Sequence, residues 1–581
     1  MTRIREEIKK IIRGALPYNF DGEVLVSVPD VTEHGDYSTN VAFALAKIQK
    51  TSPREAAEEM VAKIKEQGLR MKENVFSRIE GAGGGFINFW ISDEALFGKL
   101  GEMLWKPEGW GRSNTGKGKK IRVEYFQPNV AKIPHVGHMR SAVIGDALKR
   151  IFLSQGHKVV SDTHIGDWGT QFGILLYAWK EASKEDQEKI KKNPVRGLND
   201  LYVAEGKKIE AEPERRERGK EEFAKLEQGD KENRKIWKWM VTVSLVEFDE
   251  IKRRFGLLRF EEERAESVYE DAMPPLVERA LKKGVAARKP LDSAQGVTGA
   301  VVVDLSDVGL GEAVLLKSDG ASTYLLRDLA TLEYWDKKKL DKNLYVVDIR
   351  QSHHFSQVFD VGKRLGIPLA SRSEHIVFGF MSLPEGAMST RKGNVIGLLD
   401  VLDTMEARAR EIIEKKNPEL KNKEKVAKAV GVGALKYFDL SHHPKSNIMF
   451  DKEKALSFEG NTGPYLQYTY ARLRSILRKI QDTRHKKQTS PKFDECERGL
   501  LVEMLRFPEA VEDAAKVYAP SVLANYLYGL AQKANEFYHS HPVLKEGDAE
   551  KRRFRLMLVE AVAATLKNGL YLLGIEAVEE M

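Results

Sequence analysis

The alternation of strand-like and helical segments between residues 121 and 380 constrains the fold more than any other feature. Six short apolar runs have the composition of strands: IRVEYF (121–126), VVSDTH (159–164), AVVVDL (300–305), AVLLKS (313–318), LYVVDI (344–349) and HIVFGF (375–380). Helical patterns lie between several of them. Such alternation is typical of βαβ units, whose strands are parallel. The sequence therefore predicts a doubly wound α/β sheet in the middle of the chain.

The flanking segments predict a multidomain protein, α/β at its start and all-α at its end. A small α/β domain is expected first, with strands at VLVSVP (24–29) and GAGGGFINFWIS (81–92), and a Gly- and Lys-rich linker follows at 110–120. Lys- and Glu-rich helices near 180–265 interrupt the central domain as an insertion. We expect the last helices to have a core of their own. The predicted domains are 1–112, 113–400, a connecting helical segment 401–440, and 441–581.

Composition excludes some classes of protein. The formal net charge is +8, from 94 basic and 86 acidic residues, which suits a nucleic-acid binder if the positive charge is clustered. Cys496 is the one cysteine, so neither an internal disulfide nor a cysteine-based structural zinc site is possible. The sequence has no apolar run of about 18 residues and no secretory signal. We expect a cytoplasmic protein that does not bind membranes.

The segment VEYFQPNVAKIPHVGHMRSAVIGDALKRIF (123–152) is the strongest candidate for a phosphate site. A strand ends near Phe126, a loop follows, and the 3.6-residue periodicity predicts a helix from about Met139. Helix N-termini beside a sheet attract anions. His135 and His138 can donate hydrogen bonds to a triphosphate, and Gly137 leaves room for a nucleotide. Taken alone, HxGH fits two loop histidines that cap a helix better than a phosphate site, because so short a motif recurs by accident.

A second candidate is the glycine-flanked segment GAMSTRKGNVIG (386–397). Its cations can neutralise a leaving pyrophosphate. Taken alone, the segment also fits a solvated surface turn.

Together the two segments resemble the signatures of class I aminoacyl-tRNA synthetases. HVGH (135–138) is similar to the HIGH signature, and MSTRKG (388–393) to a variant of the KMSKS loop. Further stretches resemble the arginyl-tRNA synthetase family nearly end to end: HGDYSTNVA (34–42), GGFINF (84–89), PNVAKIPHVGH (128–138), GDWGTQFG (166–173), LLKSDGASTYLLRDLA (315–330), YVVDIRQSHH (345–354), GPYLQYTYAR (463–472) and LKNGLYLLGI (566–575).

The resemblance implies ligation of L-arginine to tRNA(Arg) through an arginyl-adenylate. It implies ATP with Mg²⁺, bound by His135, Gly137, His138, Met388 and Ser389, in a Rossmann-type catalytic domain. It also implies an N-terminal domain that contacts the tRNA elbow and a helical anticodon-binding bundle. We expect a monomer.

The resemblance also implies the positions that contact arginine: Glu124, Asn129, Tyr324, Asp328 and Gln351. The residue types suit a planar cation with five donors and no acceptor. Asp328 can accept two parallel hydrogen bonds from the guanidinium, and Tyr324 lies one helical turn earlier. Without the resemblance, a helix salt bridge would explain Asp328 as well.

The signature loop departs from the class pattern. Ala387 and Thr390 stand where the class has its two lysines. The resemblance implies that Lys132, just before HVGH, supplies the catalytic cation, with Arg391 and Lys392 adding charge nearby. The stretch before Gln351 also differs from the family's usual small residues.

Two alternatives remain open at this point. A small adenylyltransferase could share HxGH, although the chain length argues against it. A catalytically inactive RNA-binding relative is the other, and the intact histidines argue against that one. In the C-terminal part, tyrosines interleave with Arg472, Arg474 and Arg478. They suit stacking on unpaired anticodon bases, but a solvated helix face with core tyrosines fits them equally.

Overall fold

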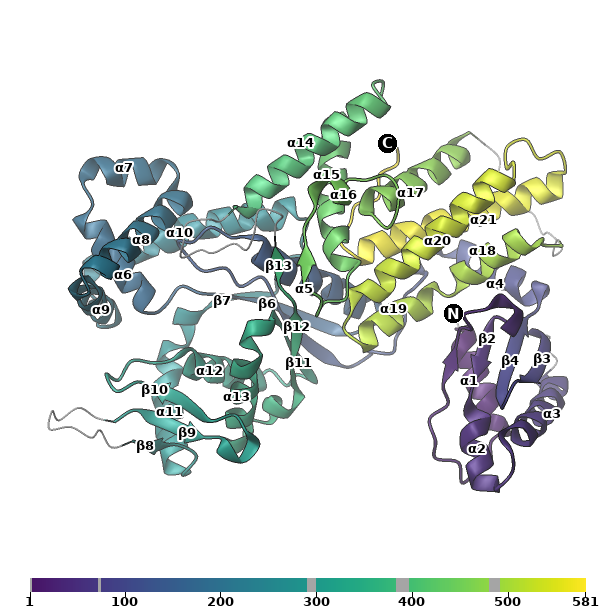
Figure 1. The fold of residues 1–581 in the computed structure, drawn as a ribbon, viewed down its shortest axis with the longest axis horizontal. Helices are drawn as coiled ribbons and strands as arrows, with labels where there is room; N and C mark the ends of the chain where they lie inside the picture. Colours follow the sequence, from purple (N-terminus) through teal and green to yellow (C-terminus); the bar gives the residue numbers. More distant parts are fainter. Residues whose placement is uncertain (1–2, 72–74, 290–298, 383–395, 480–491) are drawn as a thin grey trace.

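The computed structural model describes residues 3–71, 75–289, 299–382, 396–479 and 492–581 (Figure 1). The signature-loop positions Met388, Ser389, Arg391 and Lys392 lie outside these ranges, so the predictions made for them stay predictions. The N-terminal domain lies at one end of the molecule and the inserted helices at the other, with the catalytic domain and the C-terminal helices between them.

The N-terminal domain is an antiparallel sheet, in the order β1-β2-β4-β3, packed with helices. The apolar side chains of α1 recur at Ile4, Ile8 and Ile12 and face the domain core. The strand expected at 24–29 is shorter, and the glycine-rich stretch separates two strands as a hairpin turn. The elements are α1 (Ile4–Ala15), β1 (Val26–Ser27), β2 (Tyr37–Thr39), α2 (Val41–Gln49), α3 (Pro53–Met71), β3 (Phe76–Ala82), β4 (Phe86–Ile91) and α4 (Asp93–Trp105).

The central sheet is parallel, with the strand order β12-β11-β5-β6-β7. The predicted doubly wound α/β fold is therefore confirmed. The chain leaves β5 toward β6 and β7 and returns on the other side as β11 and β12, so the direction of winding reverses between β5 and β11. The elements are β5 (Lys120–Glu124), α5 (Val136–Ser154), β6 (Lys158–Ile165), β7 (Glu262–Ala265), α12 (Tyr324–Asp336), β11 (Lys342–Asp348), α13 (Ser352–Arg364) and β12 (Ser373–Phe378).

Two of the predicted parallel strands are wrong. The runs at 300–305 and 313–318 form β9 (Val301–Asp304) and β10 (Glu312–Leu316), which pair antiparallel with each other. With β8 (Ala287–Arg288) they make a separate small sheet beside α11 (Met273–Lys282). The connection between β9 and β10 covers only 305–311, which is too short for a crossover helix. This small sheet, together with α12 and α13, has its own apolar core.

The insertion predicted near 180–265 is helical as far as Arg254, but its predicted last residues form β7, the edge strand of the parallel sheet. Its helices project from the side of the catalytic domain (Figure 1). Lys–Glu pairs three or four residues apart cover their exposed faces. The helices are α6 (Thr170–Glu181), α7 (Lys184–Lys192), α8 (Pro194–Ala211), α9 (Glu214–Glu227) and α10 (Lys231–Arg254).

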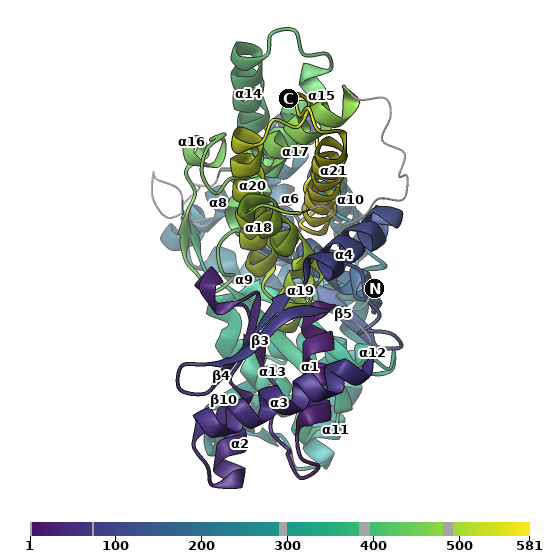
Figure 2. The same ribbon diagram turned by 90° about the vertical axis from the view of Figure 1, so that its right-hand side faces the viewer.

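The rest of the chain is almost entirely helical, and its long helices stack side by side (Figure 2). The strand β13 (Met381–Ser382) pairs parallel with β14 (Ile448–Met449). The helices are α14 (Leu398–Lys416), α15 (Lys423–Leu440), α16 (Lys452–Ala455), α17 (Gly463–Arg478), α18 (Glu495–Leu505), α19 (Phe507–Lys516), α20 (Pro520–Ser540) and α21 (Ala549–Leu572).

The expectation of a separate core for the last helices is wrong. One continuous set of buried apolar residues runs from Ile4 through the catalytic sheet to Val578. Helix α5 explains this continuity, because it is buried on nearly all sides. It packs against β6 and β11 and also against α15, α19, α20 and α21. Removing the residues after 441 would therefore expose the helix that begins at the phosphate site.

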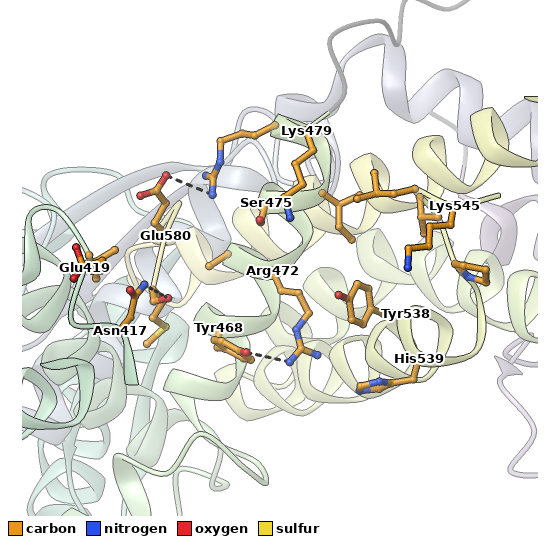
Figure 3. A pocket seen from close by; sticks show the side chains of 18 of the residues that line it. Asn417, Glu419, Tyr468, Arg472, Ser475, Lys479, Tyr538, His539, Lys545 and Glu580 are labelled. Carbon is orange, nitrogen blue, oxygen red and sulfur yellow. Dashed lines mark hydrogen bonds and ion pairs between the residues drawn. The ribbon is translucent and has the colours of Figure 1, made fainter. Parts of the chain in front are cut away.

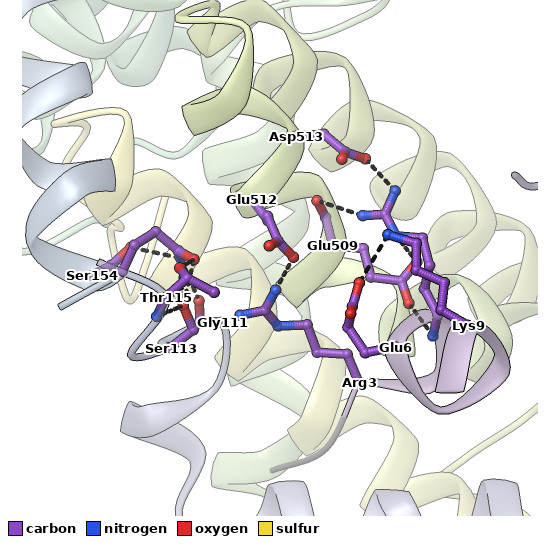
Figure 4. Close-up of polar contacts among 12 residues, drawn as sticks. Arg3, Glu6, Lys9, Gly111, Ser113, Thr115, Ser154, Glu509, Glu512 and Asp513 are labelled. Atoms are coloured by element: carbon purple, nitrogen blue, oxygen red, sulfur yellow. Dashed lines mark hydrogen bonds and ion pairs between the residues drawn. The ribbon is translucent and has the colours of Figure 1, made fainter. Parts of the chain in front are cut away.

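Charged side chains add to the apolar contact between the N-terminal domain and the C-terminal helices (Figure 4). Arg5 Nη1 lies 2.9 Å from Asp513 Oδ2, and Arg3 pairs with Glu512. Arg498 Nη2 lies 2.7 Å from Asp36 Oδ2. These pairs fix a domain that sits away from the catalytic cavity against the C-terminal helices.

Candidate functional site

A cavity of about 480 Å³ opens at the carboxyl ends of β5, β6 and β11. It lies where the winding of the parallel sheet reverses, which is where such sheets bind ligands. Eight of the residues assigned from the sequence line it: Glu124, Asn129, His135, Gly137, His138, Tyr324, Asp328 and Gln351. The positions expected for arginine and those expected for ATP thus share one cavity.

The HVGH segment forms the first turn of α5, which begins at Val136 rather than near Met139. His135 is the N-cap, and its Nδ1 accepts the backbone N–H of Gly137 at 3.1 Å. His138 Nδ1 accepts the backbone N–H of His135 at 3.1 Å. Since both Nδ1 atoms accept, each neutral ring carries its proton on Nε2. The helix-capping interpretation and the phosphate-site interpretation are therefore compatible.

Both imidazoles of this segment are neutral at physiological pH. Burial, with Arg350 nearby, lowers the pKa of His135 to about 4. Burial and the neighbouring His135 ring hold the pKa of His138 well below its ordinary value. The two rings therefore offer N–H donors without carrying a charge of their own, as a site for a nucleotide anion beside cations requires.

Asp328 lies on α12 with two imidazoles at its carboxylate. His354 Nε2 is 2.5 Å from Oδ2, and His164 Nε2 is 4.0 Å from Oδ1. Burial disfavours the charged carboxylate, but the hydrogen bond and charge of His354, together with His164 and Arg327, outweigh it and lower the pKa of Asp328. Burial likewise opposes the charged His354 ring, but Asp328 raises its pKa. Asp328 thus faces the cavity as an ion and does not form the helix salt bridge that the sequence alone also allowed.

Glu124 ends β5 and is 4% exposed. Its Oε2 accepts from the Arg122 guanidinium, and its Oε1 accepts from Gln127 Nε2 at 3.3 Å. Burial raises the pKa of Glu124, while Arg122 and His164 oppose that shift. Glu266 also lines this end of the cavity, and burial raises its pKa to about 7. This end of the cavity is accordingly rich in carboxylates.

The remaining predicted residues occupy its rim. Asn129 pairs as an isolated bridge with Gly166, and a Cβ at Gly166 would lie only 2.2 Å from Asn129 Oδ1. A side chain at Gly166 would therefore displace the amide. Tyr324, the first residue of α12, is 56% exposed and lies under the Arg327 guanidinium. Gln351 is exposed, directly before α13.

Lys132 lies apart from the cavity lining. Its Nζ donates to Gln171 Oε1 at 2.9 Å and lies 5.2 Å from the centre of the Tyr202 ring. Both contacts come from the helices that lead into and form the insertion. Lys132 is thus close to the HVGH turn in the sequence, but its side chain points toward α6.

Sequence reasoning missed several residues that shape the cavity, among them Arg122, His164, Glu266 and His354. His164 had a usable signal, because it stands near the carboxyl end of a predicted parallel strand. His354 stands within the quoted stretch YVVDIRQSHH, but nothing local connects it to Asp328. Arg122 has no signal of this kind, since a charged residue inside a strand is commonly solvent-facing.

Comparisons with known proteins agree with this geometry. The model of the class I tRNA synthetase (R) catalytic domain matches residues 101–452. The chain belongs to the arginyl-tRNA synthetase family. The model of the arginyl-tRNA synthetase N-terminal domain matches residues 2–91, and that of the DALR anticodon-binding domain matches residues 466–581.

Relatives cover the whole chain. An arginine–tRNA ligase of Halothermothrix orenii is 38% identical over 564 residues, 96% of each chain. One of Clostridium acetobutylicum is 36% identical over 584 residues, covering 100% of this chain and 99% of the relative. The solved arginyl-tRNA synthetase of Thermus thermophilus superimposes with a TM-score of 0.82 at 28% identity, with complete coverage of both chains.

Membership of this family makes the chain an enzyme that joins arginine to tRNA(Arg) in an ATP-dependent reaction. The adenylyltransferase and inactive-relative alternatives are thereby set aside. None of the helices in the described ranges combines the length and apolar character that crossing a bilayer requires.

A second hollow of the synthetase lies in the C-terminal helices, between α17 and the end of α20 (Figure 3). Its volume is about 940 Å³. The Arg472 guanidinium lies 4.7 Å from the centre of the Tyr468 ring and 5.1 Å from that of Tyr538. Arg472 also donates to Asn535 Oδ1 at 2.9 Å. Tyr468 therefore belongs to an open aromatic groove, while Tyr465 packs against the core.

Proposed function

We propose that the cavity divides into an arginine end and an ATP end that meet beside β5. Asp328 and Glu124 bind the guanidinium at one end, and His135, Gly137 and His138 bind the nucleotide phosphates at the other. The observation that carries this proposal is that a buried carboxylate, Glu124, a half-buried one, Asp328, and the capped N-terminus of α5 line one cavity. An arginine carboxylate held between the two ends would lie close to the α-phosphorus.

The carboxylate end suits arginine rather than lysine. A guanidinium supplies five donors in a rigid plane, whereas an ammonium supplies three around one point. Asp328 and Glu124 come from different elements, so a planar fork can reach both. Tyr324 can cover the guanidinium plane, and Asn129 and Gln351 suit the amino and carboxylate groups of the amino acid. Lysine would leave buried acceptors unpaired, which gives strong rejection.

The HVGH turn would act in the transition state. Attack by the arginine carboxylate forms the new bond to the α-phosphorus and breaks the bond to pyrophosphate, so charge builds on the phosphate oxygens. The Nε2–H groups of His135 and His138 are positioned before the reaction begins, because backbone N–H groups hold both rings. Donors that are fixed in advance need no reorganisation as charge develops.

The leaving pyrophosphate needs cations as well. We assign Lys132 this role, with Arg391 and Lys392, and we assign nucleotide contacts to Met388 and Ser389 of the signature loop. The support for Lys132 is its position six residues before His138. To bind a phosphate, its ammonium would have to leave Gln171. Thr390 is neutral, so the usual second lysine of the loop is missing.

ATP would enter as its magnesium complex. Mg²⁺ supplies charge neutralisation at the phosphates when it is bound. Of the described residues near His135, Asp348 offers a carboxylate, but Arg350 holds both of its oxygens at 2.9 Å. The phosphates and water would therefore provide most of the metal ligands, which fits the preference of Mg²⁺ for retaining water.

The groove around Arg472 is the proposed anticodon site. Open tyrosine rings beside a guanidinium provide stacking surfaces and donors for unpaired bases. We further propose that the synthetase acts as a monomer in the cytoplasm. The single cysteine, Cys496, is consistent with a reducing compartment, and light scattering of the purified protein measures the oligomeric state.

The test is pyrophosphate exchange and aminoacylation of total tRNA with each of the twenty amino acids. We expect charging with arginine only, and rejection of lysine by roughly 10⁴-fold or more, as a site built to hydrogen-bond its substrate gives. Comparable charging with lysine would contradict the proposed division of the cavity.

A further inference from the structure

Two carboxylates stand directly opposite each other in the parallel sheet beneath the arginine end of the cavity. Glu124 on β5 is in register with Asp162 on β6. Their exposed fractions are 4% and 0%. Like charges opposite each other on neighbouring strands repel, and burial strengthens that repulsion. On its own, such a pair would take up a proton and lose one of its two charges.

Arg122 lies between these two carboxylates and is itself fully buried. Its Nη2 donates to Asp162 Oδ2 at 2.7 Å and also to Glu124 Oε2. Its Nη1 donates to Asn343 Oδ1 at 2.9 Å. One guanidinium thus connects three neighbouring strands, β6, β5 and β11, just below the cavity.

Two aromatic rings fix the plane of this guanidinium. Its Cζ lies 4.5 Å from the ring centre of Trp335 and 5.1 Å from that of Tyr345. Trp335 belongs to α12, the helix that also carries Asp328, and Tyr345 lies on β11. A flat cation between two rings cannot rotate without losing both contacts. The Glu124 carboxylate that it holds is therefore fixed as well.

We propose that Arg122 is a positioning residue for arginine recognition, which holds Glu124 ionised and turned toward the cavity without touching the substrate. This inference rests on the proposed role of Glu124. Arg122 binds Oε2 and leaves Oε1 to the weaker contact with Gln127 at 3.3 Å. The substrate guanidinium would meet the oxygen that Arg122 leaves available. In this proposal, an arginine side chain of the enzyme holds the carboxylate that binds the substrate arginine.

The charges around Glu124 support this role. Burial raises its pKa, and the neighbouring Asp162 and Asp328 raise it further. Arg122 gives the largest opposing contribution, followed by His164. Without Arg122, His164 would be left to oppose the combined effect of burial, Asp162 and Asp328 on the pKa of Glu124. The pKa of Glu124 would then rise further, and the neutral carboxyl that this favours attracts a cation far less.

The test compares Arg122→Met, Asp162→Asn, their double variant and Arg122→Lys by pyrophosphate exchange in the presence of tRNA. Arg122→Met should raise the KM for arginine roughly 10- to 100-fold at pH 7, as expected for loss of a buried charge contact. The KM for ATP should stay within about twofold. Asp162→Asn in the Arg122→Met background should recover about half of the loss on a logarithmic scale, because it removes the opposing carboxylate. Arg122→Lys keeps the charge and should lose less than Arg122→Met.

The pH profile separates positioning from general damage. The KM for arginine should fall more steeply with rising pH in Arg122→Met than in the wild-type enzyme, because loss of Arg122 raises the pKa of Glu124 further, whereas the contribution of His354 is the same in both proteins. Arg555→Met is the matched control. Its guanidinium is also buried, 2.8 Å from Glu497 Oε1 in the C-terminal helices. It should lower the melting temperature without changing the arginine KM.

The possible failures are distinguishable. If Glu124→Gln leaves the arginine KM unchanged, the proposed cavity assignment fails. If Glu124→Gln raises it but Arg122→Met does not, the positioning role alone is wrong. A double variant with the same KM as Arg122→Met at every pH would also overturn the inference. If Arg122→Met does not fold, Arg122→Lys and the double variant decide by the same measurements.

Discussion

The two hollows of this synthetase recognise polar partners in opposite ways. In the catalytic cavity the carboxylates are already paired: half-buried Asp328 with His354, and fully enclosed Glu124 with Arg122. In the C-terminal groove the half-buried guanidinium of Arg472 lies beside two tyrosine rings and donates to neutral groups, Asn535 and the Tyr468 hydroxyl. Buried charges are screened little by salt, while exposed ones are screened strongly. The cavity is therefore suited to a small ion of fixed shape, and the groove to a large, flexible nucleic acid.

The largest effect expected from this difference is at Asp328. Asp328→Asn should raise the arginine KM by roughly 10²- to 10³-fold, because one partner of a buried charged contact is removed. ATP affinity should stay near that of the wild type, since the HVGH turn is untouched. The KM values follow from pyrophosphate exchange at two salt concentrations. If the arginine KM changes little, or if high salt abolishes the defect, the proposed difference in salt screening between the cavity and the groove is wrong.

Lys132 tests whether the cation requirement extends beyond the cavity lining. Lys132→Ala should slow single-turnover activation by about 10²-fold, the scale of one lost oxyanion-type donor, with little change in arginine KM. Adding Thr390→Lys should restore a good part of the rate. If Lys132 serves only tRNA or solvent, the variant should change tRNA affinity and its salt dependence alone, and Thr390→Lys should rescue nothing.

The pH dependence of arginine binding tests the charged pair in the catalytic cavity directly. Asp328 raises the pKa of His354 above its ordinary value. At low pH the charged ring therefore occupies Asp328, and as pH rises through this raised pKa the ring becomes neutral and releases the carboxylate to the substrate. We expect the arginine KM to fall as pH rises through this raised pKa, by at most about tenfold per pH unit, which is the limit for one competing proton.

His354→Gln provides the control for that profile. The amide cannot be charged, so the variant should show a flatter dependence of the arginine KM on pH. The groups that also face this site are His164, Glu266 and Glu124. Glu266 has a pKa of about 7, so Glu266→Gln must be measured alongside. An unchanged profile in His354→Gln would assign the titration to Glu266 or His164 instead.

The sequence predicted the parallel sheet and the lining of the cavity better than it predicted how the parts join. The strands β5, β6 and β11 lie where the strand-like runs indicated, although buried charged residues, Arg122, Glu124 and Asp162, interrupt the apolar sequence of β5 and β6. The runs of β9 and β10 have the same composition but pair antiparallel. Periodicity does not encode a strand's partner, although the short connection at 305–311 could have excluded a parallel pair.

The parts of the site that sequence reasoning missed depend on long-range contacts. His354 lies 26 residues from Asp328 along the chain, and Arg122 meets Asn343 at a separation of 221 residues. Only the packing of the sheet brings such pairs together. The same holds for the continuous core, since the sequence of α5 shows an apolar helix but not the four helices that cover it.

The smallest effect expected is in the groove, at the pair Arg472 and Arg474. Both are arginines on α17, two residues apart, but their surroundings differ. Arg472 lies between Tyr468 and Tyr538, whereas Arg474 is paired with Glu579 at 2.7 Å on an exposed surface. Stacking on aromatic rings contributes about 1–3 kcal/mol per base, and an exposed ion pair contributes about 0–1 kcal/mol.

Arg472→Ala should therefore weaken tRNA binding about tenfold, since it removes the guanidinium and leaves the two rings without the group that spaces them. Arg474→Ala, which keeps the groove intact, should change the dissociation constant by about twofold or less. Both are measured by filter binding over a range of salt concentrations, with arginine KM as the unaffected readout. The salt slope should fall by about one for a residue that contacts phosphate and should stay unchanged for one that only stacks. Equal losses of tRNA affinity in the two variants would mean that the groove recognises only positive charge. The groove and the catalytic cavity would then differ in solvent exposure but not in the kind of contact they make.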